Sequence, residues 1–155
     1  MGAVYFYHLT KKPLEKALPI LLEKAMQAGW RVEVRGNSAQ RLAWLDEQLW
    51  VGTEDSFLPH ALAGDANDAS QPILLSTKST GQADCIMSID GALITKSEVE
   101  GSERVCILFN GSDKDQLNVA RQQWKLLTDA GCLAQYWSEE TGRWQKKSEN
   151  KAPTC

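Results

Sequence analysis

The sequence predicts a single α/β domain in which helices flank a largely parallel sheet. Short, continuously apolar segments, which are typical of buried parallel strands, alternate along the chain with segments of helical periodicity. The length of 155 residues suits one ordinary domain and is too short for two of comfortable size. Apolar residues make up 43% and charged residues 24% of the chain, a balance that argues against disorder.

The first predicted strand and helix lie in the first thirty residues. Residues 3–8 are rich in aromatic side chains and valine, which favours a strand. Leucine and alanine then recur at i, i+3 and i+4, which predicts a helix that begins near Pro13 and ends at Gly29. Because Pro19 falls inside this pattern, we expect the first turns of the helix to bend or loosen.

A second strand and helix follow directly. Residues 30–35 alternate as a strand, and Asn37 or Ser38 is placed to cap a helix that runs through Trp50. Residues 51–72 then lose all periodicity and are dominated by Gly, Asp, Asn, Ser and Pro. A loop of about twenty residues is uncommon in a compact domain and is usually functional or mobile.

The second half of the chain contains three short apolar segments and one long amphipathic helix. The strands are expected at residues 73–76, 85–89 and 104–109. The helix is expected over residues 113–130, before Gly131, and a last strand or hairpin over residues 132–138 and the Thr141-Gly142 turn. We therefore expect a domain over residues 1–145 and a polar, disordered C-terminal tail over residues 146–155.

Charge is distributed unevenly along the chain. The formal net charge is −3. Residues 1–45 carry seven basic and three acidic side chains, whereas residues 46–68 carry six acidic and no basic ones. This balance disfavours binding of nucleic acid through its phosphates, so we expect no direct sequence-specific binding of nucleic acid, and it suits a surface that meets another protein.

The sequence favours a cytoplasmic protein without a metal site. No apolar run approaches the ~18–20 residues of a membrane helix, and the first residues lack a basic segment followed by an apolar one. The four cysteines are far apart, and Cys85, Cys106 and Cys132 lie in apolar segments, so we expect reduced structural thiols. The acidic residues of the 51–72 loop lack the spacing of a calcium loop.

Signatures of catalysis and of cofactor binding are missing from the sequence. Residues 9–13, which follow the first strand, contain no glycine to cradle a phosphate, and no G-x-S-x-G motif occurs. His60 lies near Asp55 and Ser56, which offers a weak alternative: a small nucleotide-binding or hydrolytic α/β enzyme that uses the His60 loop. A histidine that organises its loop through hydrogen bonds is the simpler interpretation, so we expect no catalytic residue and no cofactor.

Two features of the sequence are candidates for a binding surface. The first is Trp50 followed by Phe57, Leu58, Pro59 and His60, which brings large apolar side chains into an otherwise polar loop. Aromatic residues in such a place either cover the core or anchor a partner, and the residues alone leave both open.

The second feature is the helix over residues 113–130, which carries two adjacent stripes. The apolar stripe consists of Leu117, Ala120, Trp124 and Leu127. The basic stripe, about 40° wide at ~100° per residue, consists of Lys114, Arg121 and Lys125. An indole beside cations can receive a ligand that has both an apolar end and negative charge. The simpler alternative is a solvated helix face on which Asp129 pairs with Lys125.

Several of these segments together resemble the chi subunit of bacterial DNA polymerase III holoenzyme. The most specific are residues 45–50, Leu-Asp-Glu-Gln-Leu-Trp, and residues 56–64, Ser-Phe-Leu-Pro-His-Ala-Leu-Ala-Gly. Further matches are residues 5–9, residues 71–75 and the Ala-Arg-Gln-Gln-Trp-Lys segment at 120–125. Their order and spacing are kept over residues 3–145.

The resemblance implies a monomeric, non-catalytic accessory protein of the clamp loader, with a Rossmann-like fold and no bound nucleotide. Chi proteins pair with the small psi subunit, and through a separate surface they bind the acidic C-terminal tail of single-stranded DNA-binding protein, which ends in an apolar residue and Phe. The psi-facing positions would be Trp50, Phe57, Leu58, Pro59 and His60. The tail-binding positions would be Lys114, Arg121, Trp124 and Lys125.

This sequence departs from the family pattern at one tail-binding position. Some members place a basic residue one helical turn before the arginine, where this chain has Leu117. Lys114 lies on the same stripe as Arg121 and is placed to supply that charge, and the residues alone leave open whether it does.

Overall fold

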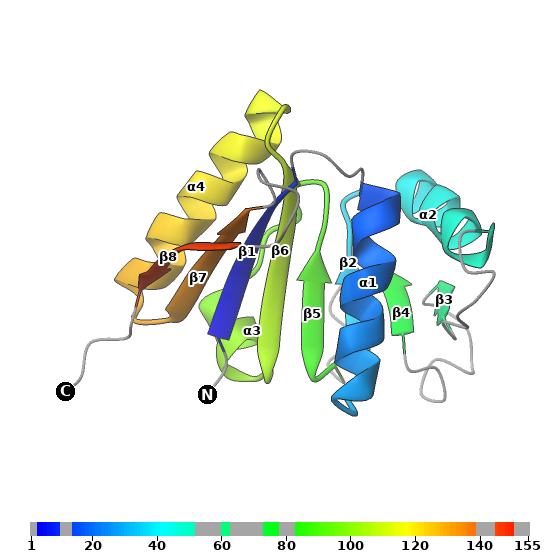
Figure 1. Ribbon diagram of the computed structural model, residues 1–155, viewed down its shortest axis with the longest axis horizontal. Coiled ribbons are helices and arrows are strands. Elements are labelled where there is room, and N and C mark those ends of the chain that lie inside the picture. Colours follow the sequence, from blue (N-terminus) through cyan, green and yellow to red (C-terminus); the bar gives the residue numbers. More distant parts are fainter. Residues whose placement is uncertain are drawn as a thin grey trace.

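The computed structural model describes residues 3–9, 14–51, 60–62, 73–77, 83–138 and 145–150, and the side chains of all of these except residues 15, 49–51, 60–62 and 145–150. Its centre is one eight-stranded sheet with strand order β3-β4-β2-β5-β6-β1-β7-β8 (Figure 1). Each neighbouring pair of described strands is parallel except β7 and β8, which are antiparallel. The expectation of an α/β fold with a largely parallel sheet is therefore confirmed.

The elements alternate along the chain as the sequence predicts. The strands are β1 Ala3–Leu9, β2 Val32–Arg35, β3 His60–Leu62, β4 Ile73–Ser76, β5 Cys85–Ser88, β6 Arg104–Asn110, β7 Leu133–Ser138 and β8 Gln145–Asn150. The helices are α1 Leu14–Gln27, α2 Ala39–Val51, α3 Lys96–Glu100 and α4 Lys114–Asp129.

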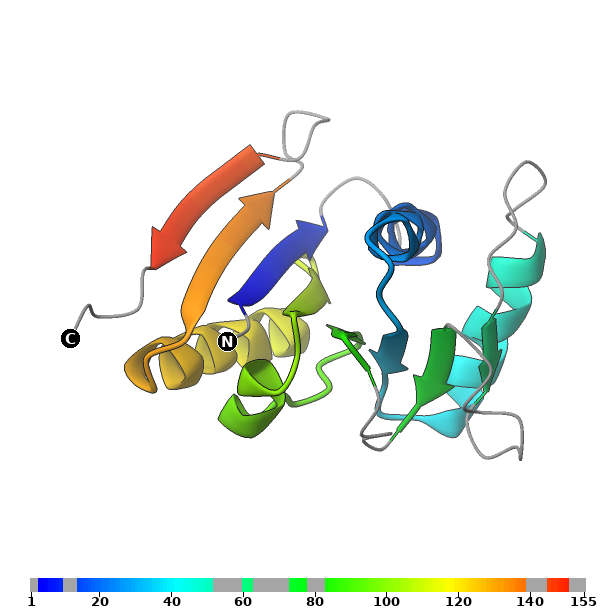
Figure 2. The ribbon, with the colours of Figure 1, turned by 90° about the horizontal axis from the view of Figure 1, so that it is seen from below.

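Two hydrophobic clusters lie on the two faces of the sheet. The first joins the leucines of α1 and α2 to one face of the strands, with Leu18, Leu22 and Leu45 fully buried. The second joins α3 and α4 to the other face, around Phe6 and Phe109. Figure 2 shows α3 and α4 on one side of β1 and β7, with α1 on the other side. The sheet is therefore the middle layer of a three-layer fold.

Capping residues set the ends of the helices. The Ser38 hydroxyl accepts a hydrogen bond from the Arg41 N–H at 3.4 Å, so Ser38, of the two predicted candidates, caps α2. Asp113 caps α4, because its carboxylate accepts hydrogen bonds from the N–H groups of Asp115 and Gln116. Gly131 follows α4 with φ of +91°, a conformation in which glycine is not strained. Helix α1 continues through Pro19, and the bend expected there stays a prediction.

Three elements differ from the sequence-based expectation. Strand β3 lies inside the segment expected to be a loop, where it pairs with β4. Helix α3 was not expected; it spans five residues and begins with a capping box between Thr95 and Glu98. Residues 146–150, expected to belong to a disordered tail, instead form most of β8, because the polar segment pairs with β7. The boundary proposed at residue 145 therefore falls at the start of the last strand.

Cys85, Cys106 and Cys132 are buried free thiols, which confirms the expectation for these three; Cys155 lies outside the described residues. None of the described helices is long and apolar enough to cross a membrane.

Candidate functional site

Helix α4 is held on the sheet by an apolar face and one buried amide. Ala120 and Leu127 are buried in the second hydrophobic cluster, and Leu117 packs against the same cluster. Gln123 is also buried, and its Oε1 accepts a hydrogen bond from the Ile94 N–H at 2.9 Å. Because a buried amide oxygen needs a partner, this bond fixes the rotation of α4 about its axis. That rotation decides which side chains of α4 face solvent.

Trp124 lies at the border between the core and the surface. Its indole packs edge-on against Phe6, with ring centroids 5.3 Å apart, and against Tyr136, with centroids 6.3 Å apart. Edge-to-face contacts of this kind orient a ring as well as bury it. The side chain remains half-buried, so part of the indole is open to a ligand. Trp124 is therefore an ordered, partly accessible apolar surface.

The three predicted cations of α4 are exposed on the same helix as this indole. Lys114, Arg121 and Lys125 all lie at the surface. Within the described part of the chain none of them forms an ion pair, and the alternative pairing of Lys125 with Asp129 is not made there. Leu117, which replaces a basic residue, is half-buried against the core and adds no charge. This face of α4 can therefore attract an anion.

Two side chains from the strands complete the surroundings of Trp124, and the sequence pattern did not indicate either. Tyr136 is the register partner of Phe6, and its hydroxyl lies 2.6 Å from His8 Nδ1. The His8 ring in turn stacks on Phe109, with centroids 5.1 Å apart. These contacts hold Tyr136 against the indole. Strand alternation would place each residue on one face, but only the pairing of β1 with β7 brings them together.

All five predicted psi-facing residues lie outside the described side chains. Position 50 lies in the last turn of α2 and position 60 begins β3, but neither side chain is described. Phe57, Leu58 and Pro59 lie outside the described residues, as do Asp55 and Ser56 of the hydrolytic alternative. The backbone places α2 in contact with β3 at one edge of the sheet. Helix α4 covers the opposite end of the sheet (Figure 1).

A group of buried charges lies between β2 and α3. The Arg35 guanidinium donates hydrogen bonds to Glu33 and Glu98. Burial alone would lower the pKa of Arg35, but the hydrogen bonds and negative charges of the two carboxylates outweigh burial and raise this pKa. Burial also opposes ionisation of Glu98, but its hydrogen bonds with Arg35 and Thr95 hold its pKa below the usual value. Every buried polar side-chain atom of the described residues has a partner. The group is thus built to fasten α3 to the sheet.

No group of three or more His, Cys, Asp or Glu side chains suited to a metal ion occurs among the described residues.

Comparison with known protein families gives a match. The family described as the DNA polymerase III chi subunit, HolC, matches residues 1–135, which is most of the chain. Comparison with curated proteins gives no match. The matched range contains α2, the 51–72 segment and all of α4, so both predicted surfaces lie inside it.

Proposed function

Because the chain belongs to the DNA polymerase III chi subunit family, a family of replication accessory subunits, we propose that it is a non-catalytic scaffold. In this proposal one surface binds the psi subunit, and a second surface binds the acidic C-terminal tail of single-stranded DNA-binding protein. The protein acts as a monomer within the cytoplasmic replication machinery, without a cofactor and without making or breaking a covalent bond.

The observation that carries the tail-binding part is the half-buried Trp124 beside exposed cations. Burial of a ligand's phenylalanine against the indole would supply the apolar contribution, and Arg121 can hold a terminal carboxylate through two parallel N–H donors. Lys114 and Lys125 extend the positive charge along α4. Exposed ion pairs contribute roughly 0–1 kcal/mol each, so the site should be weak and salt-sensitive. A micromolar dissociation constant, about −8 kcal/mol, is the affinity that we expect.

The psi-binding part is supported by the family and by the backbone. In this proposal the psi-facing positions are those that the resemblance to chi proteins implies, namely Trp50, Phe57, Leu58, Pro59 and His60. Their segment begins at the end of α2 and reaches β3, at the sheet edge remote from α4 (Figure 1). Two surfaces at opposite ends of one sheet leave room for both partners at once, which is what a bridging protein requires.

The decisive experiment is isothermal titration with a short acidic peptide that ends in phenylalanine, at two salt concentrations. The parent protein should bind, and higher salt should weaken binding because the cations are exposed. Arg121→Ala should abolish measurable binding, whereas Lys16→Ala, an exposed cation on α1, should bind as the parent does. Retention of peptide binding by Arg121→Ala, or loss of psi binding together with it, would contradict the two-surface proposal.

A further inference from the structure

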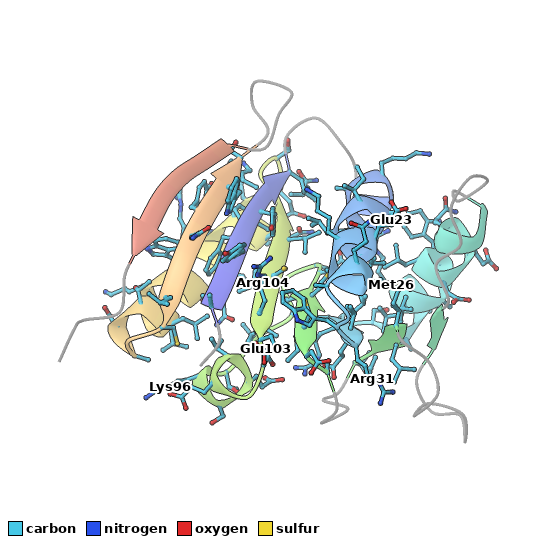
Figure 3. All side chains as sticks on the ribbon, turned by 60° about the horizontal axis from the view of Figure 1, so that its bottom comes forward. Glu23, Met26, Arg31, Lys96, Glu103 and Arg104 are labelled. Atoms are coloured by element: carbon cyan, nitrogen blue, oxygen red, sulfur yellow. The ribbon has the colours of Figure 1, made fainter. Side chains whose placement is uncertain are left out.

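A cavity of about 300 Å³ lies on the face of the sheet opposite α4. Its walls are the second half of α1, including Leu21 and Lys24, and the residues Trp30 and Arg104. Tyr7 and Cys106 form its floor, on strands β1 and β6. Figure 3 shows Arg104 on this face, between the open strands and α1. No described helix covers β1, β7 and β8 on this side, so the cavity opens beside an uncovered part of the sheet (Figure 2).

Arg104 is fixed in a way that leaves its donors available. Its guanidinium carbon lies 4.2 Å from the centroid of the Tyr5 ring and 5.0 Å from that of the Trp30 ring. The two rings contact the faces of the planar guanidinium. Its N–H groups point outward in the plane, so these ring contacts do not use them as hydrogen-bond donors. Over the described residues, the guanidinium makes no ion pair and donates no hydrogen bond. A pre-oriented guanidinium with unused donors is suited to a carboxylate or a phosphate.

Among the described residues that line the cavity, the charged side chains are those of Lys24 and Arg104, and both are cations. The carboxylate of Asp84 acts on Cys85 from outside this lining. The floor is neutral: burial raises the pKa of the Tyr7 hydroxyl, and a hydrogen bond with Cys106, together with burial, raises the pKa of the Cys85 thiol. The last carbonyls of α1 are satisfied by the N–H groups of residues 28–30. A ligand therefore meets positive charge at the mouth and an uncharged interior.

We propose that this cavity binds an acidic peptide segment of a protein partner, with one apolar side chain of the peptide inside the cavity and a neighbouring carboxylate on Arg104 and Lys24. The volume lies at the lower end of the ~300–1,000 Å³ of ligand pockets, which suits one large side chain. This site is separate from the Trp124 surface, because Tyr7 and Cys106 belong to the hydrophobic cluster on the other face of the sheet. It does not depend on the function proposed above.

Two features favour a peptide over single-stranded DNA. The interior is aliphatic, aromatic and thiol-lined, so a buried nucleobase would lose water from its polar edge without gaining partners there. The neighbouring rings also leave little face for a base to stack on. Tyr5 has Arg104 near its centroid and stacks on Trp137, with centroids 6.4 Å apart and planes inclined by 30°. An apolar side chain needs neither kind of contact.

The test uses a fluorescently labelled, C-terminally amidated peptide with one leucine between two pairs of aspartates, which lacks the terminal phenylalanine and carboxylate that the α4 site is proposed to bind. It is titrated into the full chain carrying Arg121→Ala, which removes the α4 site. Binding should persist in this background, and Lys24→Met and Arg104→Gln should each weaken it about fivefold or more. Lys16→Met, also an exposed lysine of α1 but outside the cavity lining, should not change it. Persistence together with this pattern supports the site.

A third variant tests the cavity without removing a cation, in case Arg104→Gln destabilises the fold. Ala28 is exposed, lines the cavity and follows the end of α1, so Ala28→Phe should fill the space and block the peptide while both cations remain. Equal affinity of Ala28→Phe, Lys24→Met and the background protein would overturn the proposal. So would the absence of any residual binding in Arg121→Ala, an outcome that leaves the α4 site unaffected. A labelled oligothymidine is the last probe. If it binds and these variants weaken its binding, the ligand of the cavity is single-stranded DNA, and the peptide proposal is overturned.

Discussion

Arg35 Nε donates a hydrogen bond to Glu33 Oε2 at 2.6 Å, between two side chains that are almost fully buried. The residues are two positions apart on β2, so both side chains lie on the same face of the sheet. Glu98 of α3 is the second partner of the guanidinium. A five-residue helix has little intrinsic stability, so α3 depends on this group of charges, on the capping box and on the buried Val99 for its place against the sheet.

Removing the cation from this group should be costly. We expect Arg35→Met to lower the free energy of unfolding by about 3–5 kcal/mol, because Glu33 would remain buried without its partner. Arg41→Met, which breaks the half-exposed pair with Asp90, should cost only about 0–1 kcal/mol. Urea denaturation of both variants measures the difference. Equal effects would show that the buried pair is no more important than a surface pair.

The same group predicts a loss of stability in acid. The pKa of Glu98 is lower in the folded protein than its usual value of 4.5, so its ionised form stabilises the fold at pH values above that value. This contribution is lost as the pH falls through the lowered, folded-state pKa. Urea titrations of the parent and of Glu98→Gln between pH 7 and pH 2 should differ most near neutrality and converge in acid. A constant difference across this range would contradict the assignment.

Gly111 lies close to the His8 imidazole, which holds Tyr136 against Trp124. A Cβ at position 111 would lie 1.7 Å from His8 Nε2, so Gly111→Ala should displace the imidazole from Tyr136 and Phe109. We expect a loss of about 1–3 kcal/mol of unfolding free energy. In the His8→Ala background the same substitution should cost much less, because the clash is gone. Denaturation of the two single variants and the double variant measures this coupling, and additive effects would exclude it.

Substitution of the indole tests the apolar half of the tail-binding surface. Trp124→Ala should weaken binding of a phenylalanine-terminated acidic peptide by about tenfold or more. The reason is that the peptide's phenylalanine would no longer be buried against the indole, and burial of such a ring contributes roughly 1.5–3 kcal/mol to the binding free energy. Trp124→Phe should retain part of the affinity. Leu126→Ala changes a side chain of the same helix that is 60% exposed, and it should leave binding unchanged. Peptide anisotropy gives all three affinities, and a response to Leu126→Ala equal to that of Trp124→Ala would argue for a non-specific helix effect.

The elements that the sequence predicted well are those whose signal is local. Helix α4 was expected from periodicity and the glycine that follows it, and it begins and ends within a residue of that expectation. The sequence assigned most of β8 to a disordered tail, because its Gln-Lys-Lys-Ser-Glu-Asn segment has no apolar alternation. The strand forms by pairing with β7. Strand β3 and helix α3 are too short for periodicity to reveal.

The candidate site divides in the same way. Lys114, Arg121, Trp124 and Lys125 lie on one helix, so their spacing was enough to group them. Tyr136 of β7 contacts the indole and is held there by His8 of β1, and these two strands are far apart in sequence. Their contribution depends on strand register, which a single sequence does not specify.

The last prediction concerns the psi-facing surface. Position 50 lies at the end of α2, which contacts the edge strand β3, whereas α4 covers the other end of the sheet. A change at position 50 should therefore act on one partner only. We expect Trp50→Ala to reduce co-purification of psi strongly, because a tryptophan at an interface often carries much of the binding energy, and to leave peptide affinity unchanged.

Trp44→Ala is the matched control, since it removes an exposed tryptophan of the same helix whose ring is stacked by Arg41 at 4.4 Å. Full psi binding by Trp44→Ala together with loss in Trp50→Ala would assign the effect to position 50 and not to α2 as a whole. Parallel loss of psi and of the peptide in Trp50→Ala would mean that the variant disturbs the common sheet. The proposal of two independent surfaces would then be wrong, because independence requires that damage at one edge does not reach the other.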